Sequence, residues 1–345
     1  MSGRTLLEVT GLRVGFATED GLLQAVDGVD FGLHAGEVLA IVGESGSGKS
    51  VTAQTVLGLT RSPGARIEGS VRLGGEELLG ASDEVLRKVR GERVGMVFQD
   101  PMTSFNPVYR LGAQVAEAIR AHRPRTSKDE ARERAVELFA AVGIPDPERR
   151  VGSYPHEFSG GMRQRAMIAM ALALEPEVLI ADEPTTALDV TVQAQILDLL
   201  AGLNRERGLA TLLITHDFGV VAEVADRVAV MYAGRVVEEG DLEQIFYDPQ
   251  HPYTWGLLGS TVRLDRERPR RLPQISGAPP KLVALPEGCA FRPRCPHAFG
   301  ACIEMPDLRA RLSEAPDHRD RCWLAPEAKR QRRRVEGRIG LEAPR

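Results

Sequence analysis

The sequence contains no apolar stretch long enough to cross a lipid bilayer as a helix, which takes about 20 consecutive residues. Its most apolar helical run, residues 166–174, ends at Glu175 and Pro176. The N-terminal segment MSGRTLLEVTGLRVGF also lacks the basic region, apolar run and small-residue cleavage site of a secretory signal. We therefore expect the protein to stay in the cytoplasm and to act on a membrane only through a partner.

Extremes of composition are missing as well. Of the 345 residues, 43% are hydrophobic and 27% are charged, which is ordinary for a globular protein and excludes disorder throughout. The net charge of −4 is unevenly distributed, because residues 262–345 contain 19 Lys or Arg against 11 Asp or Glu, together with half of the 22 prolines and all four cysteines. This shift predicts a boundary near residues 250–260, between a large domain (1–250) and a C-terminal extension (251–345).

The order of the predicted elements indicates an α/β fold. The first hundred residues alternate apolar and polar positions as half-buried strands do, and three apolar runs predict strands buried on both faces: VLAIV (38–42), VLIAD (178–182) and ATLLITHD (210–217). Helical spacing dominates residues 110–175, and helices then alternate with strands, as in a parallel sheet covered by helices. The sequence shows no internal repeat and no sustained heptad pattern.

A glycine-rich segment follows the first buried strand directly and opens a helix. It fits the pattern G-x-x-x-x-G-K-[ST], in which backbone N–H groups curl around phosphate oxygens, the lysine reaches the β- and γ-phosphates, and the hydroxyl binds Mg²⁺. A chance glycine-rich turn is the alternative, but the strand before it and the helix after it favour a nucleotide site. Its residues are Gly43, Glu44, Ser45, Gly46, Ser47, Gly48, Lys49 and Ser50.

Two adjacent carboxylates end the apolar strand at residues 178–182. Asp182 lies at the carboxyl end of that strand, where ligands bind in open α/β sheets, and it suits the Mg²⁺ shell directly or through water. Glu183 can polarise the attacking water as a general base. Charges at a strand end often have no function, so this assignment depends on the phosphate loop.

Further segments resemble the ATP-binding subunits of ABC transporters. SGGMRQR (159–165) resembles the signature motif of that family, and it precedes the Asp182 strand at the family's spacing. Gln99, which follows the strand RVGMVF, resembles the Q-loop glutamine. ALD (187–189) resembles the D-loop, and His216 resembles the switch histidine.

The resemblance covers residues 5–250 and implies a fold. Phe16 lies where the family places an aromatic ring under the adenine, whereas Phe158 departs from the leucine that many members have before the signature serine. The implied architecture is a P-loop (RecA-like) α/β core with an antiparallel β subdomain, a helical subdomain near residues 100–165 and a small cysteine-containing extension.

The resemblance also implies a composite ATP site. The family's signature residues open a helix whose N–H groups face the γ-phosphate of a second ATPase subunit, so two subunits close on ATP. Gln99 is then expected to bind Mg²⁺ or water and to sense the membrane partner, His216 to hold the γ-phosphate, and Asp189 to act at the dimer interface. The signature residues are Ser159, Gly160 and Gly161.

Two stretches resemble the peptide and nickel importer branch of the family: QDPMTSFNP (99–107) and DPQHPYT (248–254), the latter followed by LL (257–258). Proline-bearing loops at helix starts are the alternative interpretation. The branch uses two different ATPase subunits, two membrane permeases and an external solute-binding protein. We therefore expect an ATPase that drives import of di- or oligopeptides from the inner face of the cell membrane, with nickel or another small solute as the alternative.

Two rival functions belong to other classes. A soluble ABC ATPase of DNA repair or translation carries a long coiled-coil insertion or two cassettes, and neither occurs here. An exporter ATPase does not account for the two peptide-branch stretches.

The extension contains the cysteines Cys289, Cys295, Cys302 and Cys322. In a cytosolic protein, four clustered cysteines favour metal ligation over disulfides. Zinc sites usually show tight C-x2–4-C pairs, which are absent, so four spread thiolates favour an iron–sulfur cluster. The tail also resembles the extension of dipeptide and oligopeptide ATPases, which implies a 4Fe–4S cluster; zinc and free or structural thiols remain alternatives.

A basic run, KRQRRR (329–334), lies near the end of the chain. Only Trp323 is aromatic nearby, so base stacking and nucleic-acid binding have little support. We expect this run to be a solvated, disordered tail, with a weak contact to anionic lipid headgroups as the alternative.

Overall fold

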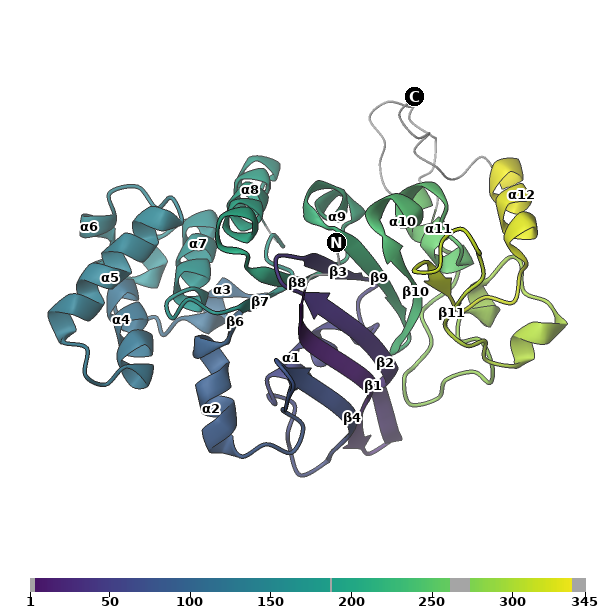
Figure 1. Cartoon of the computed structure of the whole chain (residues 1–345), viewed down its shortest axis with the longest axis horizontal. Helices are drawn as coiled ribbons and strands as arrows, with labels where there is room; N and C mark the ends of the chain where they lie inside the picture. The colour runs from purple at the N-terminus through teal and green to yellow at the C-terminus, as the bar shows by residue number, and fades with distance from the viewer. Residues whose placement is uncertain (1–3, 187, 261–273, 337–345) are drawn as a thin grey trace.

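The computed structural model describes residues 4–186, 188–260 and 274–336. The larger of its two sheets has eight strands (Figure 1). Its strands are β3 (Val38–Val42), β6 (Val94–Val97), β7 (Val178–Asp182), β8 (Ala210–Thr215), β9 (Arg227–Tyr232), β10 (Arg235–Asp241), β11 (Arg309–Ala310) and β12 (Arg319–Asp320). Their order is β11-β12-β10-β9-β3-β8-β7-β6. The strands from β9 to β6 run parallel, whereas β10, β12 and β11 pair antiparallel.

The central strands separate two hydrophobic cores. Every residue of β3, β7 and β8 is buried, as their apolar sequences predict. Alternate residues of β3 point to opposite faces, so Ala40 belongs to one core and Ile41 to the other. Helices supply both cores, and their bounds are α1 (Lys49–Val56), α2 (Asp83–Glu92), α8 (Val190–Arg207), α9 (Phe218–Val224), α10 (Leu242–Tyr247) and α11 (Pro252–Ser260).

A second sheet, of four antiparallel strands, packs beside α1. Its strands are β1 (Thr5–Thr18), β2 (Gly21–His34), β4 (Ala65–Leu73) and β5 (Glu76–Glu77), in the order β2-β1-β4-β5. Leu7, Leu12 and Val14 of β1 are fully buried and share the second core with Ala53 and Val56 of α1. This sheet is the antiparallel subdomain that the sequence predicted.

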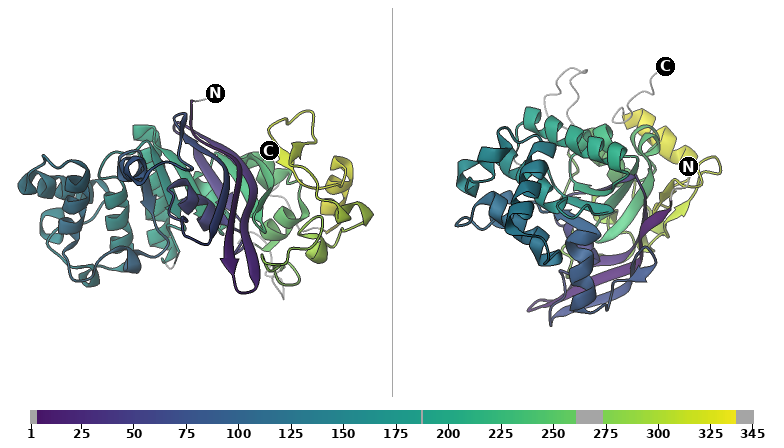
Figure 2. Two further views of the ribbon diagram at one scale, coloured as in Figure 1. Left: turned by 90° about the horizontal axis from the view of Figure 1, so that it is seen from below. Right: turned by 60° about the vertical axis from the view of Figure 1, so that its left-hand side comes forward.

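The helical subdomain lies at one end of the molecule, and the C-terminal extension lies at the other (Figures 1 and 2). The longest helix of the helical subdomain, α5 (Lys128–Ala141), begins with a capping box, in which Ser127 and Glu130 satisfy each other's backbone N–H groups. The subdomain consists of α3 (Pro101–Ser104), α4 (Leu111–His122), α5 (Lys128–Ala141), α6 (Pro147–Arg150), η1 (Pro155–Glu157) and α7 (Gly160–Ala171). The predicted α/β fold with its two subdomains and extension is therefore confirmed.

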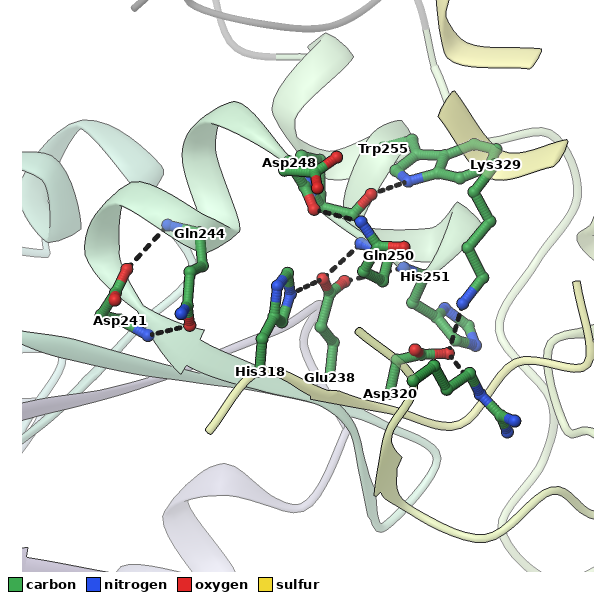
Figure 3. Close-up of polar contacts among 12 residues, drawn as sticks. Glu238, Asp241, Gln244, Asp248, Gln250, His251, Trp255, His318, Asp320 and Lys329 are labelled. Atoms are coloured by element: carbon green, nitrogen blue, oxygen red, sulfur yellow. Dashed lines mark hydrogen bonds and ion pairs between the residues drawn. The ribbon is translucent and has the colours of Figure 1, made fainter. Parts of the chain in front are cut away.

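The extension joins the main sheet through β12, which pairs with β10, and through a buried polar network (Figure 3). Glu238 of β10 is fully buried and accepts hydrogen bonds from His318 Nε2 at 2.8 Å and from the N–H groups of Gln250 and His251. Burial raises the pKa of Glu238, but His318 and the other donors bring it below its usual value. Two short helices, η2 (Arg292–Arg294) and η3 (Gly300–Ile303), complete the extension.

The basic run is not a disordered tail where the structure describes it, so that prediction was wrong. Residues 326–336 form α12 (Pro326–Glu336). Lys329 is fully buried and its Nζ lies 2.7 Å from Asp320 Oδ1, while Arg330 and Arg333 both pair with Asp248. Asp320, which lies nearby in the sequence, and the distant Asp248 take up these charges, and composition alone does not show that the fold buries them together.

Candidate nucleotide site and cysteine cavity

The phosphate loop connects β3 to α1, and two of its glycines are required by close approach of the backbone. A Cβ on Gly43 would lie 2.2 Å from the Met231 carbonyl oxygen, and a Cβ on Gly48 would lie 2.3 Å from that of Ala25. Gly48 also has a φ of 102°, which favours glycine. Since Gly48 caps α1, the free N–H groups of the first helical turn face the loop, as an anion site requires.

Lys49 and Ser47 lie inside the loop with polar groups that the protein itself satisfies poorly. Among the described residues, the Lys49 Nζ donates only to the carbonyl oxygens of Gly43 (2.8 Å) and Glu44 (3.0 Å), and burial lowers the pKa of Lys49. The Ser47 hydroxyl is buried without a hydrogen-bond partner among the described residues. These groups fit the phosphates of a nucleotide, which would supply the missing acceptors.

Ser50 and Asp182 meet, as the sequence predicted for two Mg²⁺ ligands. Ser50 Oγ donates to Asp182 Oδ1 at 2.9 Å, across the gap between α1 and the end of β7. Burial raises the pKa of Asp182, and the hydrogen bond from Ser50 offsets part of this rise. A hydroxyl and a carboxylate are oxygen donors of the kind that Mg²⁺ prefers, so this pair fits the ion.

Glu183 contacts three polar side chains at the same edge of the sheet. Its Oε2 accepts hydrogen bonds from Gln99 Nε2 (3.0 Å) and Thr186 Oγ1 (2.9 Å), and its Oε1 lies 3.3 Å from His216 Nδ1. Burial raises the pKa of Glu183, but Thr186 and His216 bring it below its usual value, so the carboxylate is ionised at neutral pH. Thr186 was not predicted from the sequence, although it lies in the same short segment as Glu183.

These groups border a cavity of about 560 Å³. It is lined by Gly43, Glu44, Ser45, Gln99, Glu183 and His216 of the large domain, and by Leu257 and Pro279, which lie beyond residue 250. Phe16 is not among the described lining residues; it is half-buried near the end of β1. The structure thus brings the start of the phosphate loop together with the predicted catalytic residues, and the contact of Phe16 with adenine stays a prediction.

The signature residues lie on the helical subdomain, away from this cavity. Ser159 caps α7 by accepting a hydrogen bond from the Met162 N–H, and Asp189 caps α8 in the same way through the Val192 N–H. A Cβ on Gly161 would lie 2.4 Å from Val192 Cγ1, so glycine allows α7 and α8 to pack closely. Ala187 of the predicted D-loop lies outside the described residues.

The four cysteines line one small cavity of about 20 Å³ in the extension. Burial raises the pKa of Cys295 to about 12 and that of Cys322 to about 11. Among the described residues, however, no group of three or more His, Cys, Asp or Glu side chains is close enough to hold a metal ion. The thiols therefore share a cavity, but they do not form a metal site in this arrangement.

No helix in the described part of the chain is long and apolar enough to span a membrane.

Two family models match the chain. The ABC transporter model matches residues 26–186, and the model of the oligopeptide/dipeptide transporter C-terminal region matches residues 237–302. An oligopeptide transport ATP-binding protein of Bacillus subtilis is 51% identical over 320 residues, which are 92% of this chain and 88% of that protein. One of Mycobacterium bovis is 54% identical over 318 residues, and the match spans only 51% of its length.

A solved structure of an ATP-binding cassette is also similar to this chain. The dimeric post-hydrolysis state of an ATP-binding cassette, bound to ADP and Pi, has a TM-score of 0.62 and 29% sequence identity, covering 69% of this chain and 99% of that one. A relative that is 51% identical over most of both chains shows the family. The chain therefore belongs to the ATP-binding subunits of ABC transporters, in the branch that carries the oligopeptide/dipeptide C-terminal region.

Proposed function

We propose that this chain binds MgATP and hydrolyses it to drive import of di- or oligopeptides through a membrane transporter. The observation that carries the proposal is the convergence of the phosphate loop, the Ser50–Asp182 pair and Glu183 on one edge of the sheet. The names of the peptide-transport relatives support the class of solute.

Each group at the edge has a role that its geometry supports. Lys49 and the loop N–H groups hold the phosphates, and Ser50 and Asp182 hold Mg²⁺, which neutralises charge on the phosphate oxygens. Glu183, ionised and oriented by Thr186, accepts the proton of the attacking water. His216 and Gln99, both in contact with Glu183, orient that water and the γ-phosphate.

The site is completed by a second ATPase subunit. Ser159, Gly160 and Gly161 lie away from this chain's own cavity, so they serve the cavity of a partner, and Asp189 lies beside them at the start of α8. A different ATPase subunit, two permeases and, indirectly, an external solute-binding protein make up the transporter. The chain is then a peripheral protein on the inner face of the cell membrane, held there by the permeases.

The test of catalysis is Glu183→Gln. The amide keeps the shape but cannot accept the proton, so we expect MgATP binding to persist while turnover falls by about a thousandfold or more. Turnover and MgATP binding of the purified transporter would be measured side by side, with Glu243→Gln on the surface helix α10 as the control. Unchanged turnover would remove Glu183 from the role of base.

The cysteine cavity holds a metal centre in this proposal, a 4Fe–4S cluster or, as the alternative, zinc. The four thiols suit either group chemically, and they must rearrange around it, because no three of the described side chains lie close enough together to hold a metal ion in this arrangement. Iron, sulfide and zinc would be measured in anaerobically purified protein and in Cys295→Ser. Four irons and four sulfides per chain, lost in the variant, would support the cluster; protein without metal would exclude both.

A further inference from the structure

One arginine of the extension reaches the phosphate loop. Arg294 at the end of η2 forms a two-pronged ion pair with Glu44, with Nη1 2.6 Å from Oε2 and Nη2 3.0 Å from Oε1. The Arg294 side chain is only 4% exposed. Glu44 directly follows the first glycine of the loop, so a residue 250 positions away is attached to the nucleotide site.

The surroundings of Arg294 fix the guanidinium in one place. Its Nε donates to the Ser276 carbonyl oxygen at 3.1 Å, and its Cζ lies 5.8 Å from the ring centre of Tyr232 and 6.0 Å from that of Phe291. Glu44 is its only carboxylate partner among the described residues. The ion pair raises the pKa of Arg294, so the charge is permanent.

A second contact holds the backbone of Glu44. The Glu44 N–H donates to the Tyr253 hydroxyl oxygen at 2.8 Å, and Tyr253 is fully buried. The rings of Tyr232 and Phe291 pack on Tyr253, with centres 4.6 Å and 5.4 Å away. Glu44 is therefore held at both its backbone and its carboxylate by residues that depend on the extension.

The position of Glu44 matters because its carbonyl oxygen, together with that of Gly43, anchors the Lys49 ammonium. Its carboxylate also borders the cavity, where an unneutralised negative charge would repel the phosphates of ATP. We infer that Arg294 is a positioning residue of the phosphate loop, which neutralises Glu44 and thereby makes MgATP affinity depend on the folded C-terminal extension.

This inference rests on the proposed function only in requiring that the loop binds MgATP. It predicts an effect on affinity rather than on chemistry, since Gln99, Glu183 and His216 contact neither Arg294 nor Tyr253 in any described interaction. The KM for ATP should therefore change while kcat stays nearly constant.

The experiment measures MgATP binding to the full chain in a Glu183→Gln background, which prevents turnover. We expect Arg294→Met to weaken binding about tenfold, as the loss of a charge-assisted pair implies. Adding Glu44→Gln to Arg294→Met removes the unpaired carboxylate and should recover at least about a third of the lost affinity on a logarithmic scale. With Glu183 intact, Arg294→Met should raise KM about tenfold and change kcat less than about twofold.

The matched control is Arg330→Met, which removes another arginine of the extension from an ion pair, with Asp248, remote from the loop. It should leave MgATP affinity unchanged. An equal loss in both variants would reflect general loosening of the extension and overturn the inference, and so would a loss in Arg294→Met that Glu44→Gln does not relieve.

If Arg294→Met does not fold, Arg294→Lys tests the inference instead, because it keeps the positive charge and loses the two parallel hydrogen bonds to Glu44. It should weaken binding by a smaller factor that Glu44→Gln again relieves, and unchanged affinity would overturn the inference. Failure of the parent chain to bind MgATP would contradict the proposed function, whereas normal binding by both the parent and Arg294→Met would contradict this inference alone.

Discussion

The large domain and the extension each bury a lysine, and the partners of the two side chains differ. Lys49 in the phosphate loop is 4% exposed, and within the part of the chain that the structure describes it donates only to two carbonyl oxygens. Lys329 on α12 is fully buried and faces a carboxylate, Asp320 (Figure 3). No carboxylate of a described residue is in direct contact with Lys49, whereas Lys329 has one.

This difference separates a binding site from a structural contact. A buried cation with no anion beside it costs stability, and proteins keep such groups where a ligand supplies the charge. A buried cation paired with a carboxylate is satisfied within the protein and fixes one element to another. The same contrast holds for the unpartnered Ser47 hydroxyl and the fully engaged Glu238 carboxylate.

The largest expected effect concerns Lys49. We expect Lys49→Met to weaken MgATP binding roughly a hundredfold or more, because the ammonium is the strongest charge aimed at the phosphates. The free energy of unfolding should stay within about 1 kcal/mol or rise, since burial of the ammonium outweighs its attraction to Glu183, Asp182 and Glu44. Calorimetric titration and urea unfolding measure the two quantities. A large loss of stability would mean that Lys49 has a structural role, and the contrast with Lys329 would then be wrong.

The opposite pattern is expected for Lys329. Lys329→Met leaves Asp320 buried with Arg311 as its one remaining cation among the residues described, so unfolding should require about 3 to 5 kcal/mol less. MgATP affinity under native conditions should remain within about twofold of the parent, since α12 does not line the nucleotide cavity. Adding Asp320→Asn should recover part of the lost stability. Unchanged stability in the single variant would show that the buried pair does not hold the extension.

The two regions also differ in how far the sequence predicts them. The phosphate loop, Asp182 and Glu183 follow buried parallel strands, whose carboxyl ends meet at one edge, so local patterns suffice to bring these residues together. The predicted cysteine group also converges on one cavity, although not as a formed metal site.

Long-range pairing is what the sequence could not supply. The basic run around Lys329 is hydrophilic by composition, and only the fold brings the distant Asp248 to it and buries the nearby Asp320 against Lys329. Glu44 and Arg294 are separated by most of the chain, and neither has a spacing that marks its partner. Burial of charge is a tertiary property, because it depends on which opposite charge lies across the interface.

A pH dependence should appear in the extension at mildly acidic pH. Burial lowers the pKa of His251 to about 4, and its Nδ1 accepts a hydrogen bond from the Tyr253 N–H, so the folded protein holds it neutral. The unfolded state binds the proton at about pH 6.5, so stability is full above that value and falls as the pH is lowered toward 4. His251 alone should account for about 2 kcal/mol between pH 7 and pH 5.

Urea unfolding at the two pH values measures this loss, and His251→Asn should reduce it while keeping an acceptor for the Tyr253 N–H. Glu238, whose pKa is below its usual value, adds a loss in the same direction only at lower pH, where its carboxylate takes up a proton. The same pH dependence in parent and variant would assign the effect to groups other than His251.

The smallest effect tests whether burial, and not charge alone, gives the extension its attachment. Arg330 pairs with Asp248 as Lys329 pairs with Asp320, but the Arg330 side chain is 41% exposed and Arg333 contacts the same carboxylate. We expect Arg330→Met to lower the free energy of unfolding by about 0.5 kcal/mol, because solvent screens the pair and Asp248 keeps a partner. Urea unfolding beside Lys329→Met gives the comparison directly. An equal loss in the free energy of unfolding in the two variants would show that the exposed and the buried ion pair hold α12 equally well. Burial would then not distinguish the two ion pairs at this interface.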